Sequence, residues 1–228
     1  MCNVAAVILS AGKGKRMKSD ISKQYMLFDN KPIIYYTIKA FIESRVDRII
    51  LVTGKEDIEY VRRDILNKYG FDDSVSLVEG GRERFDSAFN GVKAAEGSDY
   101  VLIHDGARPC IMPEDINDII EHVKENGASV MGVPVKDTIK ILNSANEVVD
   151  TPDRNTLWQI QTPQAFEWGV IYNAYNKMYE YGDKSITDDS MVVEKYSEKK
   201  VKIIAGKYSN IKVTTPEDMG LLEQFLKK

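Results

Sequence analysis

The 228-residue chain contains few of the residues that build disulfide frameworks or metal centres. It has two cysteines, Cys2 and Cys110, and two histidines, His104 and His122. The cysteines form no CxxC pair and no zinc spacing, so we expect two reduced thiols in a cytosolic protein. The histidines form no HExxH pattern. The small number and the spacing of these residues argue against both a disulfide framework and a histidine-based zinc site.

Long apolar runs and an excess of basic residues are also missing. No basic segment precedes the short apolar run near the start, and no stretch is long enough to span a bilayer. Lys plus Arg number 31 against 35 Asp plus Glu, which gives a net charge of −4. Because phosphate backbones demand a basic face, we expect no nucleic-acid partner. The lack of a spanning stretch leads us to expect no membrane partner, and the two reduced thiols lead us to expect a cytoplasmic location. Any anion site must therefore be local.

The chain instead shows alternating strand and helix patterns. Its length fits a single domain over residues 1–228. The expected strands are 4–10, 48–53, 75–78, 100–104, 128–135, 201–205 and 211–213. The expected helices are 32–44, 55–69, 84–95, one from Pro113 onward, one within 165–181, 188–196, and one opened by Thr215-Pro216-Glu217-Asp218. This alternation predicts a three-layer α/β fold, in which a mostly parallel sheet carries helices on both faces.

One segment interrupts this rhythm. Residues 138–142 and 147–151 are short strand-like runs joined by Asn-Ser-Ala-Asn, a turn composition. They predict a β-hairpin arm over residues 137–157 that projects from the body. A projecting hairpin is marginal alone, so we expect it to pack on a second copy of the chain.

The stretch VILSAGKGKRMKSDISKQY, residues 7–25, places a glycine loop with five basic residues directly after the first strand. A GxGxxG dinucleotide fingerprint fails because Met17 occupies the third position, and GxxxxGK[ST] is absent. On the loop alone, a solvated turn remains open. An anion-binding loop is favoured because ligands bind at the carboxyl ends of strands in open α/β sheets. Glycines admit backbone N–H groups, and Arg16 and Lys23 add suitable cations.

Polar motifs follow other strands as well. Glu79-Gly80-Gly81-Arg82 precedes the helix that contains Ser87, and it is either a tight turn or a backbone surface for a flat base. In His104-Asp105-Gly106-Ala107-Arg108-Pro109, Asp105 could hold a divalent cation or simply pair with Arg108. Thr187 and the two aspartates after it could cap a helix. Lys212 is a phosphate ligand if it points into the same cleft.

The chain resembles the 2-C-methyl-D-erythritol 4-phosphate cytidylyltransferases of the non-mevalonate isoprenoid pathway, from Val7 to about Asp218. The matching motifs, in the family's order, are SAGKGKRM with SKQY, EGGRERFDS, HDGARP, DTIK, LWQIQTPQAF, TDDSMVVE and NIKVTTPED. The resemblance implies a Rossmann-like nucleotidyltransferase fold. It also implies transfer of CMP from CTP to methylerythritol phosphate, with Mg²⁺ or another divalent cation as cofactor, in a homodimer.

The resemblance also implies roles for individual residues. The catalytic residues would be Arg16, Lys23 and Lys212. CTP would be bound by Ala11, Gly12, Gly14, Gly81 and Ser87. The sugar-alcohol phosphate would contact Asp105, Arg108, Thr138, Arg154, Thr162, Thr187 and Lys212, with Arg154 reaching the partner subunit's site. Asp105 would also bind Mg²⁺.

Three departures from the family's pattern fall in loops. Leu9-Ser10 stand where Pro-Ala is usual, Gly106 where Ala is usual, and Arg82 where an acidic residue is often found. We expect CTP preference to survive them. Ribitol-5-phosphate cytidylyltransferase is the alternative enzyme, which resembles the chain through its first half. A non-catalytic nucleotide-binding sensor is the alternative of another class.

Overall fold

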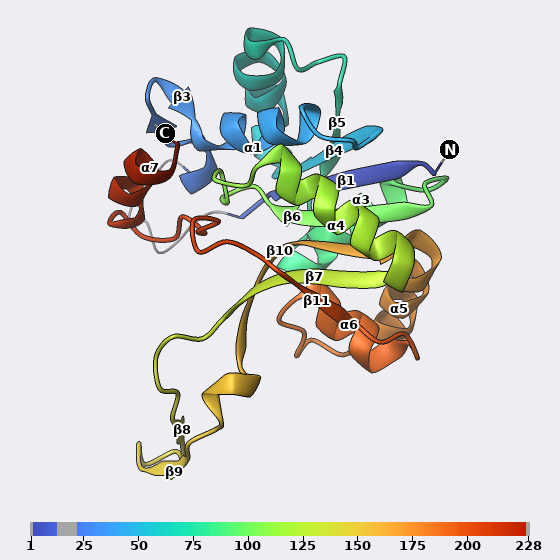
Figure 1. The fold of residues 1–228 in the computed structure, drawn as a ribbon. Helices are drawn as coiled ribbons and strands as arrows, with labels where there is room; N and C mark the ends of the chain where they lie inside the picture. The colour runs from blue at the N-terminus through green and yellow to red at the C-terminus, as the bar shows by residue number, and fades with distance from the viewer. Residues whose placement is uncertain (1, 13–21, 227–228) are drawn as a thin grey trace.

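A seven-stranded sheet forms the centre of the computed structural model, which describes residues 2–12 and 22–226 (Figure 1). In order across the sheet, the strands are β11 (Lys202–Ala205), β7 (Ala128–Pro134), β10 (Trp158–Glu167), β6 (Tyr100–Asp105), β1 (Val4–Ser10), β4 (Arg48–Thr53) and β5 (Val75–Glu79). β1 pairs in parallel with β4 and β6, as β4 does with β5 and β7 with β11. The predicted mostly parallel sheet is confirmed.

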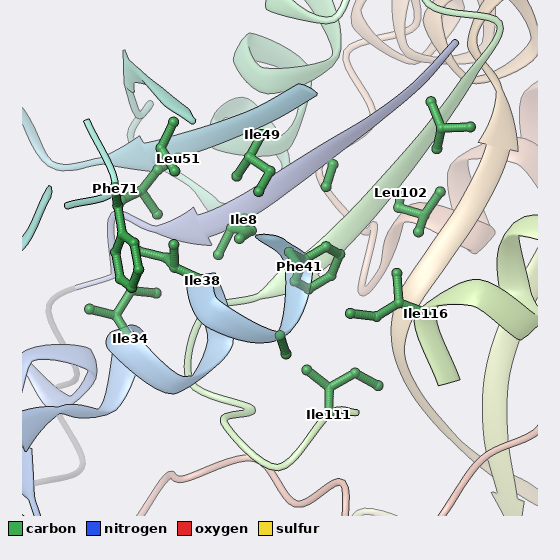
Figure 2. Packing of buried hydrophobic residues seen from close by; sticks show 14 of the residues in the cluster. Ile8, Ile34, Ile38, Phe41, Ile49, Leu51, Phe71, Leu102, Ile111 and Ile116 are labelled. Carbon is green, nitrogen blue, oxygen red and sulfur yellow. The ribbon is translucent and has the colours of Figure 1, made fainter. Parts of the chain in front are cut away.

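Helices cover both faces of this sheet. One face packs against α1 (Ile33–Ile42), the π-helical segment η4 (Val61–Asn67) and α4 (Pro113–Asn126), and Figure 2 shows part of this cluster. The other face packs against α3 (Arg84–Ala94), α5 (Trp168–Glu180) and α6 (Asp189–Tyr196). Side chains alternate along a strand. In β1, Ala6 and Ile8 therefore enter the first cluster while Ala5 and Val7 enter the second. The predicted three layers are confirmed.

The sequence patterns missed β10, which pairs antiparallel with both β6 and β7. It contains Pro163 and several glutamines, which are uncommon inside a central strand. The register of β10 against β7 shifts between Ile160 and Gln164, and this irregularity accommodates the proline. β10 also carries Thr162 to the end of β6, where the site lies.

Several element boundaries differ from the expected ones. Residues 211–213 are not a strand, because Val213 N–H makes one backbone bond, to Ala107 O (2.8 Å), rather than a ladder. The last helix, α7, spans Asp218–Leu226 and not residues from 215, because the Asp218 carboxylate accepts the preceding N–H groups of Thr214 (2.7 Å) and Thr215 (2.9 Å).

The segment expected as one helix over 55–69 instead passes through three helical forms. It runs through η3 (Lys55–Asp57), α2 (Ile58–Tyr60) and η4. A small sheet of β2 (Leu27–Phe28) and β3 (Lys31–Pro32), which the patterns did not indicate, lies between the first loop and α1.

The hairpin arm is confirmed as a projection from the body (Figure 1). Its strands β8 (Ile141–Leu142) and β9 (Val148–Asp150) are shorter than expected and pair only with each other in the described chain. The arm exposes large apolar side chains: Ile139, Ile141, Leu142, Val148 and Val149. They leave the arm with little core of its own.

Both cysteines are free thiols in the structure. Cys110 packs in a third small cluster with Val213 and Leu222, and burial raises the pKa of its thiol to about 12. This cluster fastens α7 beside the start of α1. Within the described ranges, no helix has the length and apolar character needed to cross a bilayer.

Candidate active site

The loops that follow β1, β5 and β6 enclose a pocket of about 220 Å³ at the carboxyl edge of the sheet. Ligands of open α/β sheets bind at this edge. The predicted site residues that line the pocket are Ala11, Gly12, Lys23, Gly81, Ser87, Asp105 and Lys212. They come from five separate segments of the chain, so the fold brings together what the sequence holds apart.

A buried amide holds the base of the glycine loop. Gln24, in the turn η2 (Lys23–Tyr25), donates from Nε2 to the carbonyl oxygens of Ser10 (2.7 Å) and Gly12 (3.2 Å). The hydroxyl of Tyr25 accepts a hydrogen bond from Ser10 Oγ (3.3 Å). The residues next to Lys23 are thus tied to the end of β1, which fixes where this lysine enters the pocket.

The double-glycine loop after β5 packs closely on the first loop. Gly80 N–H donates to Thr53 O (2.8 Å), and a Cβ on Gly80 would clash with the side chain of Ala11. Gly81 N–H donates to Ser87 Oγ (3.0 Å). Ser87, predicted to recognise cytidine, therefore also orders the glycine beside it.

Asp105, at the end of β6, is surrounded by cations. Lys212 Nζ lies 2.7 Å from its Oδ2, Arg84 Nε lies 3.2 Å from its Oδ1, and Arg108 Nε lies 4.0 Å from Oδ2. Burial by itself raises the pKa of this carboxyl, but the three cations outweigh it and hold the pKa well below its usual range. The predicted Asp105–Arg108 pair thus exists, and Arg108 also donates to Asn210 O (2.8 Å).

Arg84 joins Asp105 to a second carboxylate. Its Nη2 lies 2.8 Å from Asp189 Oδ2, and the other Asp189 oxygen accepts the Tyr175 hydroxyl (2.6 Å). Burial disfavours the charged form of Arg84, but the two carboxylates more than offset this and raise its pKa. The guanidinium therefore stays charged at the wall of the pocket.

His104 lies immediately behind this wall and is fully buried. Asp105 N–H donates to Thr162 Oγ1 (3.0 Å). Because Arg108 O can only accept, the neutral His104 ring carries its hydrogen on Nε2, and Nδ1 accepts from the Thr162 hydroxyl (3.1 Å). His104 Nε2–H then donates to Arg108 O (3.3 Å). Burial lowers the pKa of His104 to about 3, which agrees with a neutral ring. Thr162 therefore supports the site from behind.

Three predicted substrate residues lie away from this pocket. Thr187 is exposed before α6, where its Oγ1 lies 3.5 Å from Met191 Sδ. Asp188, not Thr187, caps the helix. Thr138 and Arg154 are exposed on the arm, and Arg154 Nη1 donates to Lys136 O (3.0 Å). For the two arm residues, Thr138 and Arg154, the predicted substrate contacts would need a second copy of the chain.

Two predicted phosphate ligands, Gly14 and Arg16, lie outside the described residues. Sequence reasoning in turn missed Gln24, Arg84 and Asp189. Gln24 carried a signal, since it stands between a lysine of the loop and a buried tyrosine. Arg84 carried none, because an arginine at a helix start after a polar turn is an ordinary surface residue.

Within residues 2–12 and 22–226, the pocket offers a divalent cation a site that it would share with bound phosphates. Among the described residues, no three His, Cys, Asp or Glu side chains converge on one position. Asp105 accepts from Lys212 and Arg84 with one oxygen each, yet an ionised carboxylate offers about four lone-pair sites. Mg²⁺ commonly takes one or two carboxylates and completes its shell with phosphates and water. Asp105 fits that limited role.

Glycine loops and several cations thus meet at the carboxyl edge of a mostly parallel sheet. Such a pocket suits a ligand that carries several phosphates, because backbone N–H groups and cations both stabilise them. The fold and site define a nucleotide-binding α/β enzyme of the nucleotidyltransferase class.

Comparison with known proteins gives the particular family. Residues 4–228 match the family model described as IspD, 2-C-methyl-D-erythritol 4-phosphate cytidylyltransferase. The chain belongs to this family and is a cytidylyltransferase. The resemblance drawn from the motifs is confirmed.

Individual relatives span the whole chain. It is 51% identical to the 2-C-methyl-D-erythritol 4-phosphate cytidylyltransferase of Lachnospira eligens, over 97% of this chain and 98% of that protein. It is 47% identical to the enzyme of the same name from Lachnoclostridium phytofermentans, over 100% and 98%. The crystal structure of 4-diphosphocytidyl-2C-methyl-D-erythritol synthase from Anaerococcus prevotii superposes with a TM-score of 0.87 at 36% identity, covering 100% of this chain and 97% of that one.

Proposed function

We propose that this pocket transfers CMP from CTP to 2-C-methyl-D-erythritol 4-phosphate, giving 4-diphosphocytidyl-2-C-methyl-D-erythritol and pyrophosphate. The observation that carries the assignment of the site is the meeting of Lys23, the two glycine loops and the Asp105–Lys212 pair around one cavity. Membership of the cytidylyltransferase family supports the choice of substrates.

The reaction is an in-line displacement at phosphorus. A phosphate oxygen of the sugar phosphate attacks the α-phosphorus of CTP, a new P–O bond forms, and the bond to the bridging oxygen of the pyrophosphate breaks. The attacking phosphate is already largely a dianion at pH 7, since its second pKa is about 6. No general base is needed, which agrees with a buried and neutral His104.

Catalysis then depends on positioning and on neutralising charge. Lys23 faces the cavity beside the first glycine loop and stabilises the charge that grows on the leaving pyrophosphate. Arg16 joins it in this role, as the family's motif implies. Lys212 is held by Asp105 at 2.7 Å and orients the attacking phosphate. Gly81 and Ser87 bind the cytidine.

Asp105 would also hold the divalent cation that accompanies the triphosphate. A cation bound there supplies further neutralisation of the phosphate charges. Asp105 keeps its remaining acceptor sites for it while both neighbouring cations stay bound.

The active form is proposed to be a homodimer built through the hairpin arm. The apolar side chains of β8 and β9 are roughly half exposed, and a two-stranded hairpin without a core needs something to pack on. Docking on a second copy would also carry Arg154 and Thr138 toward the partner's pocket. The cytoplasmic location expected from the sequence stays a prediction.

The decisive experiment measures pyrophosphate release from CTP with methylerythritol phosphate and, in parallel, with ribitol 5-phosphate. We expect release with the first substrate and at least a hundredfold lower kcat/KM with the second, since a pocket that hydrogen-bonds its substrate can discriminate on this scale. Preference for ribitol 5-phosphate would assign the alternative enzyme. CTP binding without turnover on either substrate would assign a nucleotide sensor.

A further inference from the structure

A continuous series of hydrogen bonds links the buried face of helix α5 to the pocket. The Tyr175 hydroxyl donates to Asp189 Oδ1 (2.6 Å), and Asp189 Oδ2 accepts from Arg84 Nη2 (2.8 Å). Arg84 Nε then donates to Asp105 Oδ1 (3.2 Å). The second Asp105 oxygen accepts from Lys212 Nζ (2.7 Å). The series thus joins five side chains from five segments and ends at Lys212, a lysine that lines the pocket.

The inner end of this series is rigid. Tyr175 and Asp189 are both 0% exposed, and the Tyr175 ring stacks on Phe89 with centroids 5.1 Å apart. A carboxylate buried so completely is costly unless it is paired and hydrogen-bonded. Asp189 therefore fixes the guanidinium of Arg84, and it does so from a position that no solvent reaches.

The outer end, in contrast, has little rigidity of its own. The Lys212 ammonium sits on a flexible four-carbon stem and is about one-third exposed. Its position depends on the Asp105 carboxylate, and one oxygen of that carboxylate is taken by Arg84. The planar guanidinium bonds two carboxylates at once, which a lysine at the same place could not do with the same geometry.

We propose that Arg84 is a positioning residue for the transfer reaction, anchored by Asp189 and Tyr175 and acting on Lys212 through Asp105. The proposal rests on the proposed function of the pocket. Arg84 sets the orientation of the Asp105 carboxylate, and this places the lysine that orients the attacking phosphate. Its role is to fix geometry, beyond the charge that it brings to the pocket wall.

The first test replaces Arg84 by lysine, which keeps the charge and removes the fork. Arg84→Lys should lower kcat with methylerythritol phosphate roughly 10- to 100-fold, the scale on which a small misplacement of a reacting group acts. The KM for CTP should change by less than about threefold, since the glycine loops are untouched. An unchanged kcat would overturn the proposal.

The second test separates positioning from general support of the fold. In a Lys212→Gln background, where the lysine to be positioned is missing, Arg84→Lys should lower the single-turnover rate by less than about threefold. If the role of Arg84 were purely structural or purely electrostatic, Arg84→Lys would lower the single-turnover rate by the same factor in both backgrounds. That result would overturn the proposal.

The third test acts at the buried end of the series, at a residue that does not line the pocket. Tyr175→Phe keeps the ring but removes the bond to Asp189, so kcat should fall several-fold with unchanged KM for CTP. Tyr196→Phe is the matched control, because its hydroxyl bonds Asp183 (2.8 Å), outside the series, and it should keep the wild-type kcat. Equal effects of the two variants would contradict the series.

Failure of this inference is distinguishable from failure of the proposed function. If the wild-type chain releases no pyrophosphate with methylerythritol phosphate, the function is wrong and the positioning role with it. If the wild type is active and the Arg84 and Tyr175 variants match it, only the positioning role is wrong.

Discussion

Gln24 Nε2 lies 2.7 Å from the carbonyl oxygen of Ser10, so the residue after Lys23 is bonded directly to the end of β1. The same amide reaches Gly12 O at 3.2 Å. Both ends of the glycine loop are therefore held by one buried side chain that has two hydrogens to donate.

Gln24→Glu should loosen the loop while changing the side-chain shape very little. An ionised carboxylate cannot donate and would face two carbonyl oxygens, so a buried interaction becomes repulsive. We expect the KM for CTP to rise about tenfold, on the scale of a lost buried hydrogen bond of 1–3 kcal/mol. Steady-state kinetics with varied CTP measures this. Gln224→Glu, on the exposed face of α7, is the matched control and should leave the KM unchanged.

The contact of Gly80 with Ala11 predicts a second effect on nucleotide binding. A Cβ at Gly80 would collide with the Ala11 side chain and crowd Ser87 Oγ (3.0 Å), so Gly80→Ala should force the two loops apart. Overpacking of this kind costs about 1–3 kcal/mol. We expect a lower melting temperature together with weaker CTP binding by calorimetry. Gly169→Ala meets nothing within 4 Å and should behave as wild type. Tight CTP binding by Gly80→Ala would show that the loops can separate without consequence.

His104 predicts how stability depends on pH. Its folded pKa is about 3, below its usual value of about 6.5, so the unfolded chain binds the extra proton between these values. The contribution of His104 to the free energy of unfolding is therefore fully present above about pH 6.5. It falls by up to about 1.4 kcal/mol per pH unit below that value, until the folded ring protonates near pH 3. Asp105, with its depressed pKa, adds a loss of the same sign at still lower pH.

The measurement is urea unfolding at a series of pH values from 7.5 to 4.5, before the carboxylates titrate strongly. His104→Gln has no titrating ring and should show a shallower loss of stability than the wild type. Parallel slopes for wild type and His104→Gln would contradict the neutral buried ring.

Sequence periodicity was sufficient to predict a strand where one physical effect, the burial of apolar side chains, dominates. β1 is bounded by Val4 and Ser10 as expected, since a short and nearly continuous apolar run is typical of a strand buried on both faces. β10 was missed because Pro163 and its polar neighbours argue against a central strand, and only pairing with β6 and β7 overrides that local preference. Tertiary pairing is not visible in a single segment.

The same division applies to the site. Lys23 and Asp105, which line the pocket, were predicted because the glycine loop and the HDGARP motif follow predicted strands, whose carboxyl ends meet at one edge. Arg84 and Asp189 were missed because they are 105 residues apart, and their pairing depends on how α3 and α6 pack on the same face. Residues that position others make their contacts in three dimensions and leave little local pattern.

The exposed apolar arm predicts the assembly state and its link to turnover. Val148→Asp places a charge on β9, where the side chain is 57% exposed, so it should spare the fold of the body but prevent the arm from packing on a second copy. We expect a dimer for the wild type and a monomer for the variant by sedimentation, with turnover of methylerythritol phosphate lost and CTP binding retained. Arg154→Ala should stay dimeric and lose turnover selectively. Tyr181→Asp, on an exposed aromatic outside the arm, is the control. A fully active monomer would show that the arm serves some other purpose.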